Sequence, residues 1–354
     1  MTAIFLNCHC PNYQMIDFLK KHISRKYLVA LKKVYDAIRS IIFQILDIAL
    51  FIEIIPLAFF LKAARNRKFT NLPITKSILH KIGVYPILDH YYEPMFNPKH
   101  LKKSLREDRN LPGIDLNVKM QLEILNQFNY NEELLKFPMD KVDNKIQYCY
   151  NHGPFAAGDS EYLYNMIRHF KPSRLIEIGS GSSTLMALNA LRKNKEENPA
   201  YTCEHICIEP YEHSWLKECN IKVIRSLVEN VDKNLIASLG KNDILFIDSS
   251  HIIRPQGDVL FEYLELLPVL NSGVLVHIHD IFTPKDYPDA WVKNAVLWNE
   301  QYLLEAFLSG NKQYEIIGAT NFLMHNYYEH FAGKCPVLKM QGNKEPGSFW
   351  MRRK

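Results

Sequence analysis

Acidic residues and histidines with the potential for proton chemistry occur close together in the second half of the chain. Asp248 and His251 are the first and last residues of the sequence Asp-Ser-Ser-His. His279 and Asp280 are the last two residues of the sequence His-Ile-His-Asp. A histidine titrates near neutral pH, so it can take a proton from a hydroxyl group. Carboxylates can instead bind a divalent cation, which lowers the pKa of a bound hydroxyl. Asp248 and Asp280 are therefore expected to hold a cation or to orient an acceptor, with His279 or His251 as the base.

These residues stand at the ends of short apolar runs that are typical of buried parallel strands. Four such runs are expected to be strands: Arg174–Ile178, His205–Glu209, Asp243–Asp248 and Gly273–Asp280. Stretches with helical character alternate with them: Glu161–Phe170, Leu185–Lys195, Val228–Leu239 and Val259–Leu270. This alternation predicts an α/β fold with a parallel sheet. Ligands of open α/β sheets bind outside the carboxyl ends of the strands, which is where the acids are expected.

The first strand runs directly into the glycine turn Gly179–Thr184, which precedes a helix. Glycines allow a tight turn and a close approach to a ligand, and the hydroxyls that follow can cap the helix. A dinucleotide-binding turn would have a third glycine where this chain has Thr184, and a P-loop would contain a lysine. Glu177, just before the glycines, would repel a phosphate and attract an amine. The turn therefore favours a cationic ligand that carries no phosphate.

The pattern Glu-x-Gly-x-Gly at residues 177–181 resembles motif I of class I methyltransferases that use S-adenosylmethionine (SAM). SAM carries a sulfonium and an ammonium group and no phosphate. Glu209 ends the second strand, where a carboxylate suits the two hydroxyls of a ribose. The resemblance implies that SAM is bound by these residues: Glu177, Gly179, Ser180, Gly181, Ser183, Glu209 and Asp248.

The resemblance extends to the residues with proton chemistry and covers about residues 150–354. Asp248–His251 and His277–Pro288 resemble a branch of the class that methylates oxygen on small molecules and sugars. Some relatives bind a divalent cation, which implies Asp248, His279 and Asp280 as ligands of Mg²⁺ or Mn²⁺. Because His279 stands where some of those relatives have Glu, the site is softer than one made of carboxylates alone. His277 is expected to be a buried strand residue.

The class also implies an architecture: a Rossmann-like, seven-stranded α/β sheet that ends in an antiparallel hairpin. Gln313–Thr320 and Gly347–Arg353 are the expected hairpin strands. We expect a helical extension over residues 1–70, a cap or linker over 71–150 and the methyltransferase domain over 151–354. Tyr148–Gly158 is expected either to close over the cofactor or to serve as a plain linker.

The N-terminal extension contains Ile41–Leu61, an apolar stretch long enough to span a bilayer. Gln44, Asp47 and Glu53 interrupt it. Basic residues flank both sides, which suits a helix in the interface of an anionic membrane or a re-entrant loop. The alternative is a helix buried against the catalytic domain or against a partner chain. The flanking residues are Lys32, Lys33, Arg39, Lys62, Arg65, Arg67 and Lys68.

Composition narrows the classes of partner and the compartment. The net charge is only +5, and no platform of basic and aromatic residues is arranged for nucleic acid, so no nucleic-acid partner is expected. Seven cysteines without a CxxC spacing suit reduced thiols, with Cys8-His9-Cys10 as an isolated soft-metal pair. No secretory signal peptide is evident. We therefore expect a cytoplasmic protein that contacts the inner face of a membrane through residues 41–61.

The function expected from these patterns is SAM-dependent O-methylation of a small-molecule, sugar or lipid-linked acceptor. Two alternatives remain open at this point. One is a metal-dependent hydrolase or oxygenase that uses the Asp/His cluster. The other is a catalytically inactive scaffold with a SAM fold that docks at a membrane through residues 38–68. The sequence does not define the acceptor or the oligomeric state.

Overall fold

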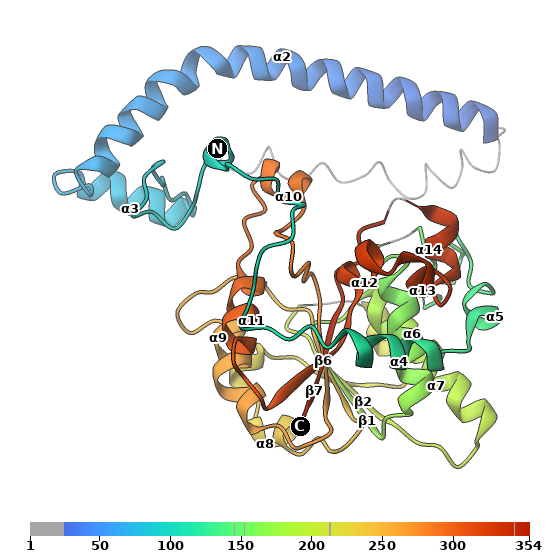
Figure 1. The fold of residues 1–354 in the computed structure, drawn as a ribbon. Coiled ribbons are helices and arrows are strands. Elements are labelled where there is room, and N and C mark those ends of the chain that lie inside the picture. The colour runs from blue at the N-terminus through green and yellow to red at the C-terminus, as the bar shows by residue number, and fades with distance from the viewer. Residues whose placement is uncertain (1–24, 145, 152, 212–213, 343) are drawn as a thin grey trace. The chain divides into compact units, whose positions relative to one another are not determined.

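The computed structural model describes residues 25–144, 146–151, 153–211, 214–342 and 344–354. The chain forms two compact units, one that ends at Asn97 and one that extends from Pro98 to Lys354 (Figure 1). The expected soft-metal pair at residues 8–10 lies outside the described residues.

Seven strands of the second unit form one sheet in the order β3-β2-β1-β4-β5-β7-β6. The first five strands are parallel to one another, whereas β7 is antiparallel to both of its neighbours, β5 and β6. The predicted seven-stranded sheet with an antiparallel C-terminal end is therefore confirmed. The strands are β1 (Arg174–Ile178), β2 (Glu204–Ile208), β3 (Lys222–Ile224), β4 (Ile244–Ile247), β5 (Leu275–Ile278), β6 (Tyr314–Ala319) and β7 (Phe349–Arg353).

Helices cover both faces of this sheet, with α6 and α7 on one face and α8, α9 and α11 on the other (Figure 1). The helices of this unit are α4 (Val118–Gln127), α5 (Asn131–Leu134), α6 (Asp159–Phe170), α7 (Ser182–Glu197), α8 (Lys233–Ala237), α9 (Asp258–Phe261), α10 (Asp289–Lys293), α11 (Glu300–Leu308), α12 (Thr320–Asn326), α13 (Tyr328–Ala332) and α14 (Pro336–Gln341). Shorter turns are η1 (Pro98–His100), η2 (Ser214–Glu218), η3 (Val228–Asn230), η4 (Glu262–Leu266) and η5 (Leu267–Val269).

The strands fill two hydrophobic cores, one on each face of the sheet. Leu175 and Phe246 belong to the core beside α6 and α7, whereas Ile176 and Leu245 belong to the core beside α8 and α9. Successive side chains of a strand point to opposite faces, so a strand covered on both faces must be apolar throughout. This explains the continuous apolar runs in the sequence.

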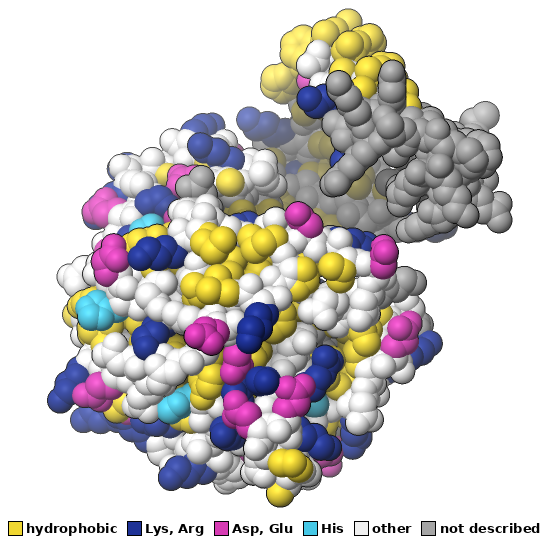
Figure 2. All heavy atoms as spheres, turned by 90° about the vertical axis from the view of Figure 1, so that its right-hand side faces the viewer, with side chains coloured by type: hydrophobic (Ala, Val, Ile, Leu, Met, Phe, Trp, Pro, Cys, Tyr) yellow, Lys and Arg dark blue, Asp and Glu magenta, His cyan; other side chains and the backbone are white. Residues whose placement is uncertain are grey.

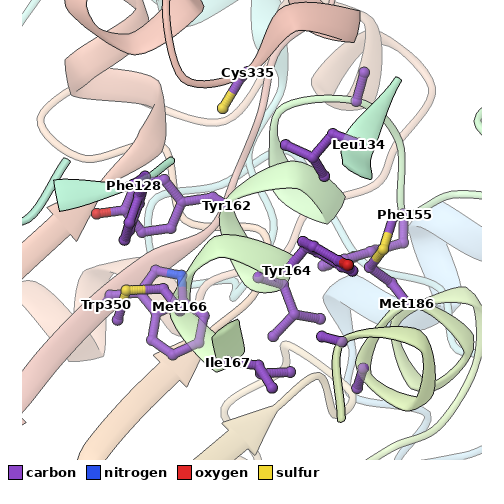
Figure 3. Packing of buried hydrophobic residues seen from close by; sticks show 14 of the residues in the cluster. Phe128, Leu134, Phe155, Tyr162, Tyr164, Met166, Ile167, Met186, Cys335 and Trp350 are labelled. Carbon is purple, nitrogen blue, oxygen red and sulfur yellow. The ribbon is translucent and has the colours of Figure 1, made fainter. Parts of the chain in front are cut away.

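The segment before the sheet contributes large side chains to the first of these cores. Phe128 contacts Tyr162 of α6 edge to face, with ring centroids 5.3 Å apart. Tyr162 in turn lies 6.3 Å from the ring of Trp350 in β7, and all three side chains are buried (Figure 3). Residues 118–150 therefore pack into the same compact unit as the sheet.

Two of the predicted helices are interrupted. Val259–Leu270 begins as α9, continues as the π-helical turn η4 and ends as the 3₁₀ turn η5. Pro268 has no N–H group with which to continue an α-helix. Val228–Leu239 is divided at Asp232, whose side chain accepts a hydrogen bond from the Asn234 N–H (3.0 Å) and so begins α8. Nothing in the apolar pattern predicts β3, which has three residues, none of them buried.

The first unit contains one long helix, α2 (Arg25–Asn66), and one short helix, α3 (Pro73–Ile82). The N-terminal helix expected over residues 41–61 is present but much longer, at 42 residues, and it continues through Pro56. Every residue from 30 to 60 is exposed, and hydrophobic side chains gather on the surface of this unit (Figure 2). Within the described part of the chain, α2 alone is long and apolar enough to cross a membrane.

Candidate active site

Two cavities lie at the carboxyl ends of the parallel strands, and both are lined by residues 248–250. The larger has a volume of about 700 Å³ and contains the glycine turn on one side and His251, His279 and Asp280 on the other. The smaller, of about 220 Å³, is lined by Gly179 and Glu209, among others. This is the place where open α/β sheets bind their ligands. The two cavities meet at Asp248.

Aromatic side chains form much of the wall of the larger cavity. Tyr148 and Phe155 come from the segment 148–158, for which the sequence predicts either a cover over the cofactor or a linker. Trp215 comes from η2, which follows β2, and Trp298 comes from the loop between α10 and α11. These rings bring apolar surface beside the polar cluster, as small-molecule sites commonly require.

The glycine turn depends strictly on glycine at one of its two positions. Gly179 has a φ angle of +85°, and a Cβ atom there would lie 2.1 Å from the backbone oxygen of Asp248. A Cβ atom at Gly181 would meet nothing within 4 Å. Gly179 therefore lets β1 approach the end of β4, which brings the turn beside Asp248.

Glu177 lies beneath the turn and lines neither cavity. Its buried carboxylate accepts hydrogen bonds from Thr184 Oγ1 (2.9 Å) and Ser183 Oγ (3.4 Å) at the start of α7, and it pairs with the ring of His205. Cys207 joins these two residues in a group close enough to hold a metal ion. Burial, however, raises the pKa of the Cys207 thiol, so the thiol stays protonated. Glu177 thus braces the turn from below.

Glu209 ties the ends of β1 and β2 together. Its Oε2 accepts hydrogen bonds from the backbone N–H and the hydroxyl of Ser180, both at 3.1 Å. Its Oε1 accepts a hydrogen bond from the Tyr211 N–H at 2.8 Å. A carboxylate has about four lone-pair sites, so Glu209 keeps capacity for a ligand in the smaller cavity.

The four residues with expected proton chemistry meet at the junction of the cavities. Asp248 Oδ1 lies 3.2 Å from His251 Nε2 and 3.5 Å from His279 Nδ1. The carboxylate of Asp280 lies 3.6 Å from His251 Nε2 and 3.5 Å from His279 Nδ1. Asp248, His279 and Asp280 offer ligand atoms that all lie within 4.8 Å of one another.

The charges of this cluster stabilise one another. Burial opposes ionisation of Asp248, but His279 and His251 hold its pKa well below the usual range. Burial lowers the pKa of His251, but Asp248 and Glu300 more than offset it and raise that pKa to about 10. Burial also lowers the pKa of His279, but Asp280 and Asp248 outweigh this effect and raise the pKa well above its ordinary value. His251 is therefore protonated at neutral pH, and the neighbouring carboxylates favour the protonated form of His279 as well.

Glu300 completes the cluster, although the sequence analysis does not predict it as a site residue. It is the first residue of α11, it is fully buried, and its Oε2 lies 2.8 Å from His251 Nδ1. Its Oε1 accepts a hydrogen bond from the hydroxyl of Tyr263 at 3.1 Å. The backbone oxygen of His251 accepts hydrogen bonds from the N–H groups of Asn299 and Glu300. The available signal is weak, since a glutamate that begins a helix is common.

His279 has a second acidic neighbour that the sequence does not indicate. Its Nε2 is buried, has no hydrogen-bond partner among the described residues, and lies 3.8 Å from Asp159 Oδ2. Asp159 begins α6 and accepts hydrogen bonds from the N–H groups of Gly347 (2.9 Å) and Ser348 (2.7 Å). His277, as predicted, is a buried strand residue, with Nε2 2.9 Å from the hydroxyl of Ser348.

Comparisons with known proteins find one family model, one curated relative and several solved structures that are similar to this chain. A family model described as a methyltransferase domain matches residues 176–281. An uncharacterized protein of Archaeoglobus fulgidus is 30% identical over 181 residues, which cover 48% of this chain and 80% of that protein. A putative O-methyltransferase from Klebsiella pneumoniae is 15% identical over 65% of this chain and 89% of its own, with a TM-score of 0.32. An O-methyltransferase from Bacillus cereus, solved with S-adenosylhomocysteine (SAH), is 12% identical over 66% and 90%, with a TM-score of 0.34.

Proposed function

Because this chain belongs to the class I SAM-dependent methyltransferases, we propose that it methylates a hydroxyl oxygen of a small-molecule, sugar or lipid-linked acceptor. The observation that carries this proposal is the meeting of two cavities at Asp248, with the glycine turn on one side and the Asp/His cluster on the other. A cofactor and an acceptor must share such a junction for a group to pass between them. SAM supplies the electrophilic methyl group.

The cofactor is proposed to extend from the smaller cavity to the glycine turn. Glu209 is held by Ser180 and Tyr211 in a fixed position from which its free lone pairs can accept hydrogen bonds from ribose hydroxyls. Ser180, Gly181 and Ser183 line the larger cavity beside Asp248, whose negative charge favours a sulfonium nearby. Glu177 is a positioning residue in this proposal, because it acts on the turn through Ser183 and Thr184.

The acceptor is proposed to lie in the larger cavity with its hydroxyl beside Asp280 and His279. Both ring nitrogens of His251 already face carboxylates, Glu300 on one side and Asp248 on the other. His251 is therefore assigned to charge balance and orientation of Asp248. His279 is the candidate for the base that lies beside Asp280 at the edge of the cavity, and it can act as one only after its ring has lost the proton that Asp280 and Asp248 favour. Base catalysis by His279 would therefore increase as the pH rises.

The same residues fit a divalent cation. The buried and unpaired Nε2 of His279 points to this, because a neutral ring with its proton on Nε2 would direct that N–H toward Asp159 and leave the Nδ1 lone pair facing the two aspartates. Asp248, Asp280 and His279 would then be the ligands, and a mixed set of carboxylates and imidazole suits Mn²⁺ better than Mg²⁺. A bound cation would lower the pKa of the acceptor hydroxyl.

The decisive experiment combines calorimetry with SAH and transfer from radiolabelled SAM to lipid, glycan and small-molecule extracts. We expect calorimetry to detect SAH binding, and we expect one of the extracts to become radiolabelled. Label that resists treatment with base would indicate that the methyl group is held in an ether. Absence of SAH binding would contradict the whole proposal and favour a metal-dependent hydrolase or oxygenase. Binding without transfer to any extract would favour the inactive scaffold.

The N-terminal unit is proposed to attach the enzyme to the inner face of a membrane. The support is the exposed apolar surface of α2 from residue 30 to residue 60, with basic residues at both ends. A 42-residue helix is about 63 Å long, roughly twice the thickness of a hydrocarbon core. Asp47 and Glu53 would each cost about 2.5–3.5 kcal/mol at bilayer depth. Both facts favour a helix that lies in the interface over a simple span.

A further inference from the structure

The first unit has a cavity of its own, of about 440 Å³, lined by the end of α2 and by α3. We propose that this cavity binds the phosphate of an anionic phospholipid while α3 lies in the membrane interface. The proposal deepens the membrane attachment proposed above and rests on it. It concerns the first unit only and makes no use of the methyl-transfer site.

The lining of this cavity carries an excess of positive charge. Three cationic side chains line it, Arg65, Lys68 and Lys76, against a single acid, Glu93. Glu93 is already occupied, because Arg65 Nη2 lies 2.8 Å from each of its two oxygens. Lys68 and Lys76 are exposed and make no ion pair within the described part of the chain. Two uncompensated ammonium groups on one cavity are suited to a phosphate group.

The opposite side of α3 has the chemistry of a membrane surface. Ile74, Ile78 and Ile82 repeat every four residues and therefore form one stripe along the helix. Their exposed fractions are 75%, 51% and 68%. Lys76 and His80 fall on the other side of the helix, where they line the cavity. A short helix with an apolar stripe and with lysines at its edge and on its other side is typical of segments that lie in a bilayer interface.

Two further features of the first unit suit a membrane interface. Tyr91 and Tyr92 are 79% and 80% exposed, with ring centroids 4.0 Å apart, and tyrosines are enriched where lipid meets water. The exposed apolar residues of α2 end at Phe60, and the cavity lining begins at Arg65, about 8 Å further along the helix. When α2 lies in the interface, the cavity is therefore next to the end of its apolar stretch, at the depth of the lipid headgroups. An exposed isoleucine stripe on the same helix that lines the cavity favours a lipid over a soluble phosphate as the ligand.

Vesicle flotation with the full-length protein tests this inference. Two sets of phosphatidylcholine vesicles are compared, one containing phosphatidic acid and one containing oleic acid, at matched surface charge. The phosphate cavity predicts a preference for phosphatidic acid in the wild-type protein. In the double variant Lys68→Gln/Lys76→Gln, the ratio of the two partition coefficients should fall to about one. The control Lys62→Gln/Lys81→Gln removes the same charge from residues outside the cavity and should keep the preference.

Other outcomes overturn the proposal at defined points. Equal partition of the wild-type protein into both vesicles, or equal effects of the two double variants, would mean that general surface charge alone attracts the protein. Calorimetric binding of inorganic phosphate at Lys68 and Lys76 without any preference for phosphatidic acid would assign the cavity to a soluble ligand. No flotation with either vesicle would contradict the attachment by α2 itself. SAH binding is measured for each variant as a control. A variant that still binds SAH but floats differently tests the phosphate cavity alone, independently of the methyltransferase proposal.

Discussion

Oε2 of Glu300 lies 2.8 Å from Nδ1 of His251, although the two residues are 49 positions apart in the chain. The other ring nitrogen of His251 lies 3.2 Å from Asp248. Burial lowers the pKa of this histidine, but Asp248 and Glu300 outweigh it and raise the pKa to about 10. His251 therefore brings a fixed positive charge to the junction of the two cavities.

Replacement of Glu300 by glutamine should lower kcat by about tenfold or more and leave SAH affinity unchanged. The amide keeps the shape of the side chain but removes its charge, so the pKa of His251 falls and the ring loses its proton at lower pH. The pH–rate profile measures this, because its alkaline limb should move to lower pH. An equal loss of turnover at every pH would mean that Glu300 is needed only for packing.

The same pair makes the stability of the fold depend on pH. The pKa of His251 is about 10 in the folded protein and about 6.5 in an unfolded chain, so protonation stabilises the fold. This contribution is complete below about pH 6.5 and is lost as the pH rises through 10. The difference in Tm between the wild-type protein and Glu300→Gln should therefore be largest at or below neutral pH. A difference that grows toward pH 10 would contradict the charge assignment.

The two glycines of the turn should respond differently to alanine. Gly179→Ala places a Cβ atom 2.1 Å from the backbone oxygen of Asp248 at a φ angle of +85°, so the variant should lose thermal stability and SAH binding together. Gly181→Ala meets no atom within 4 Å and should keep the wild-type Tm. Thermal melts and calorimetry on both variants test this contrast. Loss of SAH affinity in Gly181→Ala at unchanged Tm would report a cofactor that approaches this backbone closely.

Glu209→Ala should weaken SAH binding by about 1.5–3 kcal/mol, the range for loss of hydrogen bonds to a charged group. Calorimetry measures the change. Glu204→Ala is a matched control, since Glu204 begins the same strand but is exposed and lines neither cavity. Equal affinities of the two variants for SAH would exclude Glu209 from the ribose site.

Asp280→Asn should reduce turnover far more than SAH affinity, because Asp280 lies with His279 on the acceptor side of the junction. A chelator then separates the two mechanisms that remain. If activity is lost with the chelator and restored by Mn²⁺, the cation mechanism holds. If activity is unaffected by the chelator and rises with pH as His279 loses its proton, the His279 ring acts as the base without a metal. Near-wild-type turnover in Asp280→Asn and in both histidine-to-alanine variants would refute the catalytic assignment.

Removal of residues 1–70 should move the enzyme from the membrane fraction to the soluble fraction, because the exposed apolar surface of α2 is then lost. Cell fractionation followed by extraction with carbonate tests this and also distinguishes an interfacial helix from a spanning one. A full-length protein that already appears in the soluble fraction would favour the alternative in which α2 is buried against a partner.

The sequence predicts the centre of the sheet well, because each strand that is covered on both faces must be apolar along its whole length. It also predicts that Asp248 and Asp280 converge, since both follow neighbouring parallel strands. It does not predict Glu300 or Asp159, which reach the histidines only through packing of α11 and α6 on the sheet. Nor does it predict the length of α2. The polar segments on either side of residues 41–61 contain no glycine or proline that would end a helix, so the helix continues beyond the apolar stretch.

The burial of Glu177 limits what the Glu-x-Gly-x-Gly pattern can tell about activity when sequences are searched for enzymes of this kind. A carboxylate that supports Thr184 and pairs with His205 is needed for the turn to keep its shape, whether or not any reaction takes place above it. A related chain without activity would still need this carboxylate to support the same turn. The Glu-x-Gly-x-Gly pattern therefore indicates the fold, and the residues that line the cavities are the better test of whether such a chain is a working enzyme.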